Sequence, residues 1–529
     1  MDRRGFVRMG VAGSAALALA QEASAAVKAD AAILDAGALE QQARMTAGTL
    51  SSHALVSRYL TRIAAIDKAG PRINAVIELN PDALAIAREL DRERAAGKVR
   101  GPLHGLAVLL KDNIATGDRM STTAGSLALE GVRATRDAHV AAQLRAAGAV
   151  IIGKTNLSEW ANMRSPRSTS GWSARGGLTR NPYALDRNTS GSSSGSGAAV
   201  AASLATFAVG TETDGSIVSP SSTCGVVGIK PTLGLVSRSG IIPIAHSQDT
   251  AGPMARSVTD AALLLAAMAG PDSADPITKD GIGKAGGYLA ALKADALKGK
   301  RIGVARDFFG LSEKVDALME KALLVLKAQG ATLVDVKLPN TDKYDDAEFQ
   351  VLLYEFAPGL ASYLANYAPQ ARIKGMADVI AFNRQHSERE LGHYAQNYLE
   401  LAQAKGGLDS KEYTDALALC KRYAGPEGIE LVMKEHQLDA LVAPTSGPAW
   451  LTDLVNGDHS GGSFSSPAAV AGYPHVTVPA GYVHGLPVGL SFVGGAWSEA
   501  ALIGMAYSYE QATKLRKAPR FMATASMTA

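Results

Sequence analysis

The sequence predicts one large α/β domain, and three observations support this prediction. Apolar residues make up 47% of the 529 residues and charged residues 19%, which is enough apolar material for a large core and too little charge for a disordered chain. Segments with the pattern of strands alternate with segments of helical periodicity along almost the whole chain. No internal repeat and no long linker interrupts this alternation.

Composition and charge argue against several classes of protein. The 53 Lys and Arg residues nearly balance the 50 Asp and Glu residues, so the chain lacks the basic field of a nucleic-acid-binding protein. Aromatic residues make up only 5%, which argues against a base-stacking surface. Two cysteines, Cys224 and Cys420, are too few for a structural zinc cluster or a disulfide scaffold, and their spacing does not decide whether they pair. No His or Cys/His spacing predicts a metal site, and we expect no cofactor.

Residues 1–25 are predicted to be a secretory signal. A basic segment, Arg3–Arg8, precedes an apolar run over 9–20, and Ala23-Ser-Ala25 matches a cleavage pattern. The arginine pair followed by x-Phe resembles a twin-arginine signal, which is read by a receptor that exports folded proteins. The alternative is a frayed amphipathic start. No later stretch has ~20 uninterrupted apolar residues, so we expect a periplasmic or secreted protein that is not inserted in the membrane after signal removal.

The mature chain opens with a helix, a strand and a second helix. Apolar residues over 55–66 recur at helical spacing, and Ser51 and Ser52 can cap the first turn. Residues 73–78 have the pattern of a strand, and residues 82–96 have the pattern of a helix.

A strand–helix–strand rhythm follows. Residues 106–110 form a short, uniformly apolar run, which is typical of a buried strand, and Lys111 stands at its end. A helix is predicted around 138–147 and a strand over 149–152. Residues 165–197 are rich in Ser, Gly and Arg and show no periodicity. An irregular segment of this length inside a compact protein usually has a functional role.

The C-terminal half repeats the alternation. Residues 301–305, 312–329 and 331–336 predict another strand–helix–strand unit, and residues 345–435 are mainly helical. Strand patterns return near the end, over 441–443, 476–479 and 488–493.

The Ser/Gly run over 190–197 has the highest density of candidate catalytic residues in the chain. A small apolar helix is predicted to follow it over 198–205. A Ser/Gly run alone is typical of a flexible linker, but the helix argues against a linker here. Gly191-x-Ser193-x-Gly195 matches the nucleophile elbow of α/β-hydrolases. The hydrophobic strand that such an elbow needs is missing before it, so Ser193 as a nucleophile is only an alternative.

Several short motifs follow one another along the chain, and the likeness that they carry runs from about residue 38 to residue 515. They are Gly101-Pro-Leu-His-Gly105, Val108-Leu-Leu-Lys-Asp-Asn113, Gly153-Lys-Thr-Asn-Leu-Ser-Glu159, Thr179-Arg-Asn-Pro182, Gly191-Ser-Ser193, Gly215-Ser-Ile217, Asp439-Ala-Leu-Val-Ala-Pro-Thr445, Ala471-Gly-Tyr-Pro474 and Gly485-Leu-Pro-Val-Gly489. In this order they resemble the amidase signature family. The resemblance implies a central mixed β-sheet covered by helices, in a domain over 34–515 that is followed by a C-terminal tail over 516–529.

The resemblance also implies a Ser–Ser–Lys triad with Ser216 as the nucleophile, Ser192 as the bridging serine and Lys111 as the base. An ammonium group cannot accept a proton, so Lys111 must be neutral. Burial at a strand end would lower its pKa from ~10.4 to ~7–8, which needs roughly 3–4 kcal/mol of desolvation. The family places a cis peptide bond before Ser192. It also implies an oxyanion hole made of the backbone N–H groups of Thr213, Asp214, Gly215 and Ser216.

One departure from the family pattern narrows the resemblance. Many members read Gly-Gly-Ser-Ile-Arg where this chain has Asp214-Gly-Ser-Ile-Val218, and this variant resembles bacterial peptide amidases. Residues 172–177 and 247–253 resemble the same subgroup, which hydrolyses the C-terminal amide of peptides to a carboxylate and ammonia. We expect a structural role for Asp214. The candidates for the substrate pocket are Met163, Trp172 and Ser193, with core packing as the alternative for Met163.

The sequence therefore predicts an exported amidase that acts on a small-molecule or peptide amide through an acyl-serine intermediate, with a monomer as a plausible state. The first alternative is an amidase for aryl or alkyl amides or lactams with the same triad. The second is a non-catalytic or amidotransferase-type subunit, and the predicted export argues against it. The third is an esterase with Ser193 as the nucleophile. His104 is expected to serve packing rather than catalysis.

Overall fold

A central β-sheet forms the framework of the computed structural model, which describes residues 32–310 and 312–526. Its strands are β1 (Val76–Leu79), β2 (Ala107–Lys111), β3 (Val150–Thr155), β6 (Phe207–Glu212), β7 (Val227–Lys230), β8 (Thr250–Ala255), β9 (Arg301–Ala305), β10 (Thr332–Val336), β11 (Ala440–Pro444), β12 (His475–Val483) and β13 (Leu486–Val493). Their order across the 11-stranded sheet is β1-β3-β2-β6-β8-β7-β12-β13-β11-β9-β10. A separate hairpin joins β4 (Trp172–Ser173) and β5 (Gly177–Leu178).

The sheet contains parallel and antiparallel pairs. β2 runs parallel to β3 and β6, and β9 runs parallel to β10 and β11. The middle of the sheet, from β6 through β8, β7, β12 and β13 to β11, is antiparallel. Helices α5 (His139–Ala146) and α9 (Glu313–Ala328) supply the crossovers that the pairs β2–β3 and β9–β10 require. The predicted mixed sheet covered by helices is confirmed.

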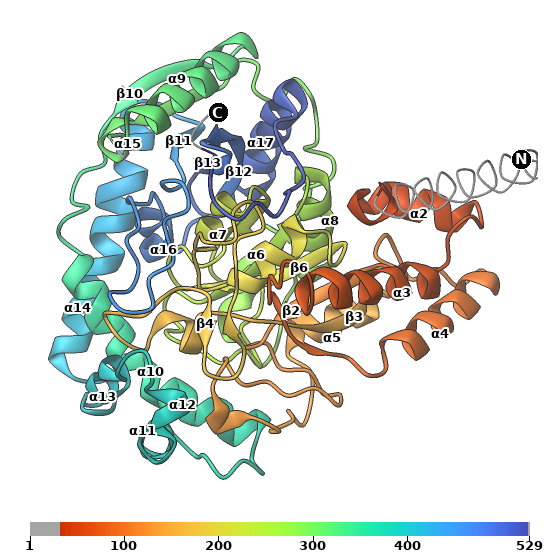
Figure 1. Cartoon of the computed structure of the whole chain (residues 1–529). Coiled ribbons are helices and arrows are strands. Elements are labelled where there is room, and N and C mark those ends of the chain that lie inside the picture. Colours follow the sequence, from red (N-terminus) through yellow and green to blue (C-terminus); the bar gives the residue numbers. More distant parts are fainter. Residues whose placement is uncertain (1–31, 311, 527–529) are drawn as a thin grey trace, which may run out of the picture.

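Helices cover the sheet on several sides (Figure 1). Those of the first half are α2 (Ala38–Thr46), α3 (Ser52–Arg62), α4 (Ala83–Ala95), α6 (Ser194–Ala201), α7 (Val218–Thr223) and α8 (Val258–Met268). Those of the second half are α10 (Asp345–Tyr367), α11 (Met376–Gln385), α12 (Ser387–Glu390), α13 (Asn397–Gln403), α14 (Lys411–Ala424), α15 (Glu430–Glu435), α16 (Ser466–Ala471) and α17 (Glu499–Thr513). In Figure 1, α2–α4 lie at the right of the molecule and α14 and α15 at the left.

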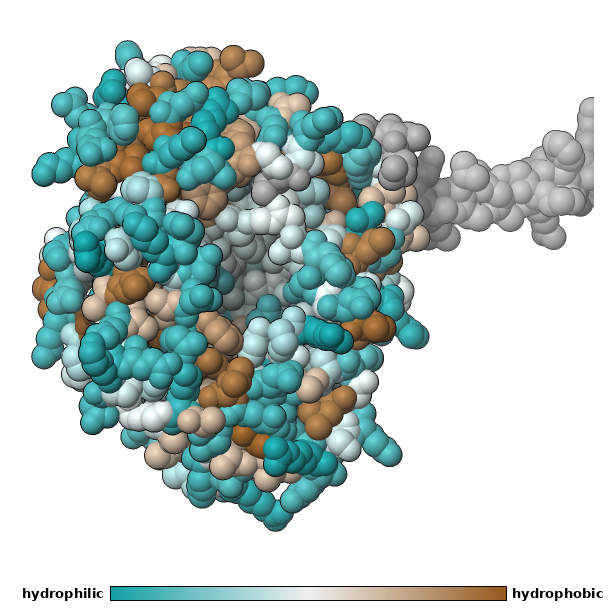
Figure 2. Space-filling model, turned by 90° about the vertical axis from the view of Figure 1, so that its left-hand side faces the viewer, coloured by the Kyte–Doolittle hydropathy of each residue, from teal (hydrophilic) through white to brown (hydrophobic). Residues whose placement is uncertain are grey.

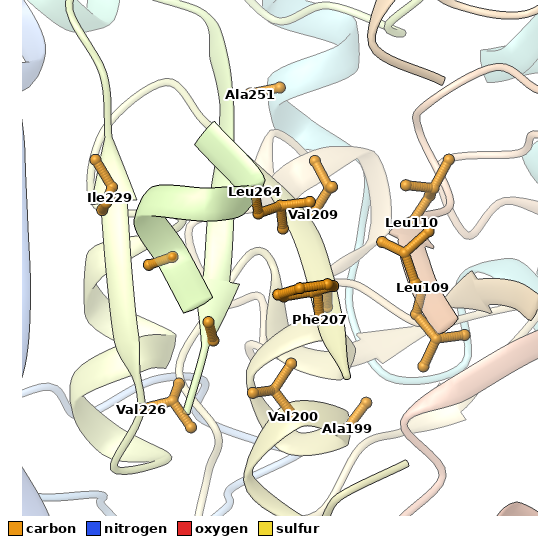
Figure 3. Packing of buried hydrophobic residues seen from close by; sticks show 14 of the residues in the cluster. Leu109, Leu110, Ala199, Val200, Phe207, Val209, Val226, Ile229, Ala251 and Leu264 are labelled. Carbon is orange, nitrogen blue, oxygen red and sulfur yellow. The ribbon is translucent and has the colours of Figure 1, made fainter. Parts of the chain in front are cut away.

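Part of the apolar core lies where β2, β6 and β7 meet helices α6 and α8 (Figure 3). Leu109 and Leu110 of β2 lie beside the strand β6, which carries Phe207 and Val209, and Leu264 of α8 lies near Val209. Every residue of β2 is buried, as the uniformly apolar run over 106–110 predicts for a strand inside a sheet. The burial includes Lys111 at its end, which matters for the site below.

The predicted elements agree with the structure in most places and differ at some boundaries. The helix predicted over 55–66 is α3, which Ser51 caps by accepting a hydrogen bond from the Ala54 N–H (3.0 Å), and it continues as a π-helical turn, Ile63–Asp67. The unit over 301–336 is β9–α9–β10 as predicted, and residues 345–435 are helical in α10–α15.

Helix α6 differs most from its prediction. It begins at Ser194, inside the Ser/Gly run, rather than at residue 198. A Cβ atom at Gly195 would lie 2.3 Å from the Ala75 carbonyl oxygen, so the helix packs against its neighbours at a distance that only glycine permits. This close packing outweighs the low helix propensity of Ser and Gly.

The two ends of the chain differ in what the structure describes. The predicted signal over 1–25 lies outside the described residues. The predicted tail is described as far as Ser526 and lies along the loop after Asn181, where the Phe521 N–H donates to the Pro182 carbonyl (3.0 Å) and the Leu185 N–H donates to the Met522 carbonyl (2.8 Å).

Three further properties concern the molecule as a whole. Cys224 and Cys420 are both buried and unpaired. Within residues 32–310 and 312–526, no helix is long and apolar enough to cross a membrane. Figure 2 shows one face of the molecule, which is hydrophilic over most of its area and hollowed near its centre.

Candidate active site

Lys111 is the last residue of β2, and its side chain is fully buried. Its Nζ donates hydrogen bonds to Ser192 Oγ (2.8 Å), to Thr211 Oγ1 (2.9 Å) and to the Thr211 carbonyl oxygen (3.1 Å). Burial lowers the pKa of Lys111 to about 7, although the nearby carboxyl groups of Asp249 and Glu212 act in the opposite direction. A substantial fraction of this lysine is therefore neutral near pH 7 and can accept a proton.

Ser192 follows a cis peptide bond, Gly191–Ser192, and is fully buried. Its carbonyl oxygen accepts a hydrogen bond from the Ser158 N–H (3.1 Å). A Cβ atom at Gly191 would lie 2.3 Å from Ser158 Oγ, so this position has room only for glycine. The surrounding loops thus hold the Ser192 hydroxyl against the Lys111 amine.

Ser216 lies between β6 and α7, and only 7% of it is exposed. Its carbonyl oxygen accepts a hydrogen bond from the Ser193 N–H (3.1 Å), which ties the loop of Ser216 to the loop of Ser192. The Glu212 carboxylate accepts from the backbone N–H groups of Ile217 (2.7 Å) and Val218 (3.0 Å) and so folds the loop back onto the end of β6.

The remaining residues of the predicted oxyanion loop have partners of their own. Thr213 Oγ1 donates to Asp249 Oδ1 (2.6 Å), and Ser466 Oγ donates to Asp214 Oδ2 (2.6 Å). Gly215 has a φ of 72°, in the left-handed region, and a Cβ atom there would lie 2.9 Å from Ser465 Oγ. The loop is therefore anchored by side chains from two distant segments of the chain.

The candidates for the substrate pocket lie in different surroundings. The Trp172 ring packs edge-on against Tyr394, with ring centroids 5.1 Å apart, and is 7% exposed. Met163 is buried in the main hydrophobic cluster, which is the core position named as its alternative. The Ser193 hydroxyl donates to the Thr211 carbonyl oxygen (3.0 Å), and no strand precedes it, so the elbow geometry of an α/β-hydrolase is absent from this described segment.

His104 is buried among backbone groups. Its Nε2 lies 2.9 Å from the Leu90 carbonyl oxygen, and its Nδ1 accepts from the Arg100 N–H (3.2 Å). This is the environment of a histidine that fixes a turn. In the part of the chain that the structure describes, no group of three or more His, Cys, Asp or Glu residues is placed to hold a metal ion.

Sequence reasoning missed several residues that hold the site. Thr211 binds the Lys111 amine through two oxygens, Asn113 Nδ2 donates to the Thr211 hydroxyl (3.0 Å), and Asp249 holds Thr213. Their roles depend on β2 and β6 being neighbours, which no local pattern reveals. Asp249 and Asn113 do fall within the motifs quoted for the resemblance, and no other signal in the sequence points to them.

The arrangement is that of a serine hydrolase: a largely desolvated lysine contacts one serine, and a second serine stands on an adjoining loop. The chain belongs to the amidase signature family, because the family profile described as Amidase matches residues 54–503. It is accordingly a serine enzyme that hydrolyses amides.

Individual relatives agree with this assignment. The chain is similar to the native peptide amidase of Stenotrophomonas maltophilia, with 55% sequence identity, a TM-score of 0.88 and coverage of 92% of this chain and 98% of that one. It is 43% identical over 485 residues to a probable amidase of Arabidopsis thaliana, a match that covers 90% of this chain and 89% of the relative. It is also 36% identical over 504 residues to a glutamyl-tRNA(Gln) amidotransferase subunit of Halorhodospira halophila, which covers 90% of this chain and 97% of the relative.

Proposed function

We propose that this protein is an exported peptide amidase that hydrolyses the C-terminal carboxamide of peptides to a free carboxylate and ammonia. The observation that carries the catalytic part of the proposal is the 2.8 Å contact between Nζ of the buried Lys111 and Ser192 Oγ. The peptide specificity is supported by the 55% identity to the Stenotrophomonas maltophilia enzyme and by the resemblance of Asp214–Val218 to the pattern of bacterial peptide amidases.

In the first half of the reaction, Ser216 Oγ attacks the carbonyl carbon of the amide. The Ser216 proton passes to Ser192, while the proton of Ser192 passes to neutral Lys111. The C–O bond forms, and the carbonyl electron pair moves to oxygen, where the backbone N–H groups of residues 213–216 stabilise it. Such donors are worth ~3–4 kcal/mol each.

In the second half, the tetrahedral intermediate collapses and the C–N bond breaks. The proton held by Lys111 returns through Ser192 to the nitrogen, which leaves as ammonia. Water then attacks the acyl-Ser216 carbonyl and gives one proton to Lys111 by the same route. The C–O bond to Ser216 breaks, Ser216 regains that proton through Ser192, and the acid leaves and gives its remaining proton to ammonia or solvent to become the carboxylate. At the end of a full cycle, Lys111, Ser192 and Ser216 are back in their starting protonation states.

The test is a substrate panel offered to the purified protein: a peptide amide, the same peptide as a free acid, an anilide and a lactam. We expect ammonia from the peptide amide and no cleavage of internal peptide bonds. Ser216→Ala should lower kcat by about 10⁶, the scale seen when a nucleophile is lost from a cooperating unit. Ser508→Ala, at a buried serine that donates to the Ala294 carbonyl far from the triad in the sequence, is the matched control.

Two outcomes would change the proposal. A preference for anilides or lactams over peptide amides would favour the alternative amidase with the same triad. Retention of more than about a tenth of the wild-type activity by Ser216→Ala would overturn the assignment of the nucleophile.

A non-catalytic or amidotransferase-type subunit is the second alternative. The relative from Halorhodospira halophila is an example of a protein of that type. Such a subunit works with partners on a tRNA-bound substrate, and a secretory signal argues against that setting. Ammonia release by the protein alone, without any partner, supports the peptide amidase.

Export is proposed from residues 1–25. The test is expression of the full chain in a bacterium that has a twin-arginine pathway, followed by cell fractionation and N-terminal sequencing. We expect a periplasmic or secreted product that starts near Ala26, and replacement of Arg3 and Arg4 by Lys should keep the precursor in the cytoplasm. Processing that is unaffected by this double replacement would contradict the twin-arginine assignment.

A further inference from the structure

A small cavity lies beside Thr211, the residue that holds the Lys111 amine, and the proposed mechanism makes no use of it. Its polar lining comes from Asn113, Thr211, Thr213, Arg238, His246, Asp249 and Thr250, and Ile241, Ile242 and Ile244 belong to its apolar part. Thr211 belongs both to this lining and to the hydrogen bonds of the Lys111 amine. The cavity therefore connects the proposed base with the proposed oxyanion loop.

Asp249 supplies the carboxyl group of this lining, and both of its oxygens accept hydrogen bonds. Its Oδ2 accepts hydrogen bonds from the backbone N–H groups of Ile244 (2.9 Å) and Ala245 (3.0 Å). Its Oδ1 accepts from Thr213 Oγ1 (2.6 Å). One carboxylate thus joins the turn over 244–249 to the first residue of the oxyanion loop.

The residue before Asp249 supports the same loop. Gln248 Nε2 donates to the Thr213 carbonyl oxygen (3.4 Å) and to Glu348 Oε1 of α10 (2.7 Å). Adjacent side chains therefore hold both the hydroxyl and the carbonyl of Thr213, and a long helix backs them.

We infer that Asp249 is a positioning residue for amide hydrolysis: its carboxylate fixes Thr213 and, through it, the backbone N–H groups of residues 213–216 where the oxyanion forms. The inference rests on the proposed role of this loop and of Lys111. A misplacement of ~1 Å in a site of this kind costs about 100-fold in rate.

The charge of Asp249 gives a second, independent readout. Burial raises the pKa of Asp249 to about 7, in the range where Lys111 also titrates, and the Asp249 carboxylate raises the pKa of Lys111. The charged and titratable groups around Asp249 are Lys111 of β2, Glu212 of β6, Glu355 of α10, and Arg238 and His246 of the preceding loop. Removal of the carboxylate should lower the pKa of Lys111 and move the acid limb of kcat/KM to lower pH.

The test compares four variants in peptide-amide hydrolysis. Thr213→Val removes the hydroxyl that Asp249 holds, and we expect kcat to fall by about 10- to 100-fold with KM nearly unchanged. Thr213→Ser restores the hydroxyl and should recover most of this loss. Asp249→Asn should lower kcat and also shift the acid limb to lower pH. Asp260→Asn changes another buried aspartate that accepts a backbone N–H, that of Ala38 (2.9 Å), and should alter neither kcat nor the pH profile.

The outcomes separate this inference from the proposed function. If Ser216→Ala is inactive but Thr213→Val and Asp249→Asn keep the wild-type kcat, the triad stands and the role of Asp249 is wrong. If Asp249→Asn does not fold, the Thr213→Val and Thr213→Ser pair still decides. A loss in Thr213→Val that Thr213→Ser does not recover would also overturn the inference.

Discussion

At Lys111 the needs of catalysis and of folding conflict. The side chain is fully buried and its pKa is about 7, whereas the same lysine in an unfolded chain titrates near 10.5. Between these two values the unfolded chain binds more protons than the folded protein, so this lysine makes the fold less stable as pH falls from about 10.5 to about 7. The proposed base is thus available at neutral pH because the fold tolerates this penalty.

The activity should report the same titration. We expect kcat/KM for a peptide amide to fall as pH drops through about 7, because protonation of Lys111 removes the acceptor, and to show no alkaline limb until another group or the fold titrates. The acid limb should persist in His104→Ala and in His246→Ala. Loss of the limb in either folded variant would point to a histidine base.

Lys111→Met should give an inactive protein that is more stable than the wild type. Methionine has a similar length and no charge to desolvate, and Thr211 keeps the donors Ser193 Oγ and Asn113 Nδ2. We expect the free energy of unfolding at pH 7 to rise by roughly 2–4 kcal/mol, as measured by urea denaturation.

The control is Lys411→Met, at a lysine whose side chain is 86% exposed, where a change within about 0.5 kcal/mol is expected. The gain of Lys111→Met should also shrink between pH 7 and pH 10, because the wild type recovers stability over that range. A variant that is less stable than the wild type at pH 7 would mean that the amine contributes more through its hydrogen bonds than its burial costs.

At the scale of single elements, α6 is the critical one, because Ser192 stands two residues before it. Gly195→Ala would place a Cβ atom 2.3 Å from the Ala75 carbonyl and 2.5 Å from the Asn156 carbonyl. The helix must shift, so we expect a loss of about 1–3 kcal/mol of stability together with a fall in kcat. Gly406→Ala, where a Cβ atom would meet nothing within 4 Å, is the matched control. Wild-type kcat in a folded Gly195→Ala protein would show that the position of Ser192 does not depend on how closely α6 packs against its neighbours.

The sequence was informative where the structure is local. The apolar run over 106–110 predicts a buried strand because a strand covered on both faces needs apolar residues throughout, and β2 confirms it. Helix α9 and its flanking strands were predicted almost to the residue, because helical periodicity ends sharply on either side. The start of α6 was missed because its glycines are selected by packing against Ala75 and Asn156 rather than by helix propensity.

The site could be predicted only in part for the same reason. Lys111, Ser192 and Ser216 came from motifs in order along the chain, and the structure brings Lys111 and Ser192 into contact. Thr211 and Asp249 contact these segments only because β6 lies beside β2 and because the turn over 244–249 folds onto the Ser216 loop. No sequence pattern within either segment predicts these contacts between segments that are distant in the chain.

At the scale of the whole molecule, the cysteines offer a test of the packing. Cys224 and Cys420 are buried and unpaired, and burial raises the pKa of each thiol to about 12. Almost no thiolate is present at pH 7, so neither thiol should react with a maleimide in the native protein, and both should react after unfolding. Reductant should leave Tm unchanged. A disulfide detected by mass spectrometry in the native protein would contradict this arrangement.

The order of strands also has a consequence for how the chain is made on the ribosome. β7 ends at Lys230, but its neighbour on one side is β12, which begins at His475 and pairs with Lys230 itself. While the intervening residues are being synthesised, the backbone of β7 has no partner on that side, and Ser465 and Ser466 are not yet present to support the loop of Ser216. A nascent chain therefore cannot complete the sheet or the active site until almost its last segment emerges. A product truncated before His475 should aggregate and should not retain partial catalytic activity.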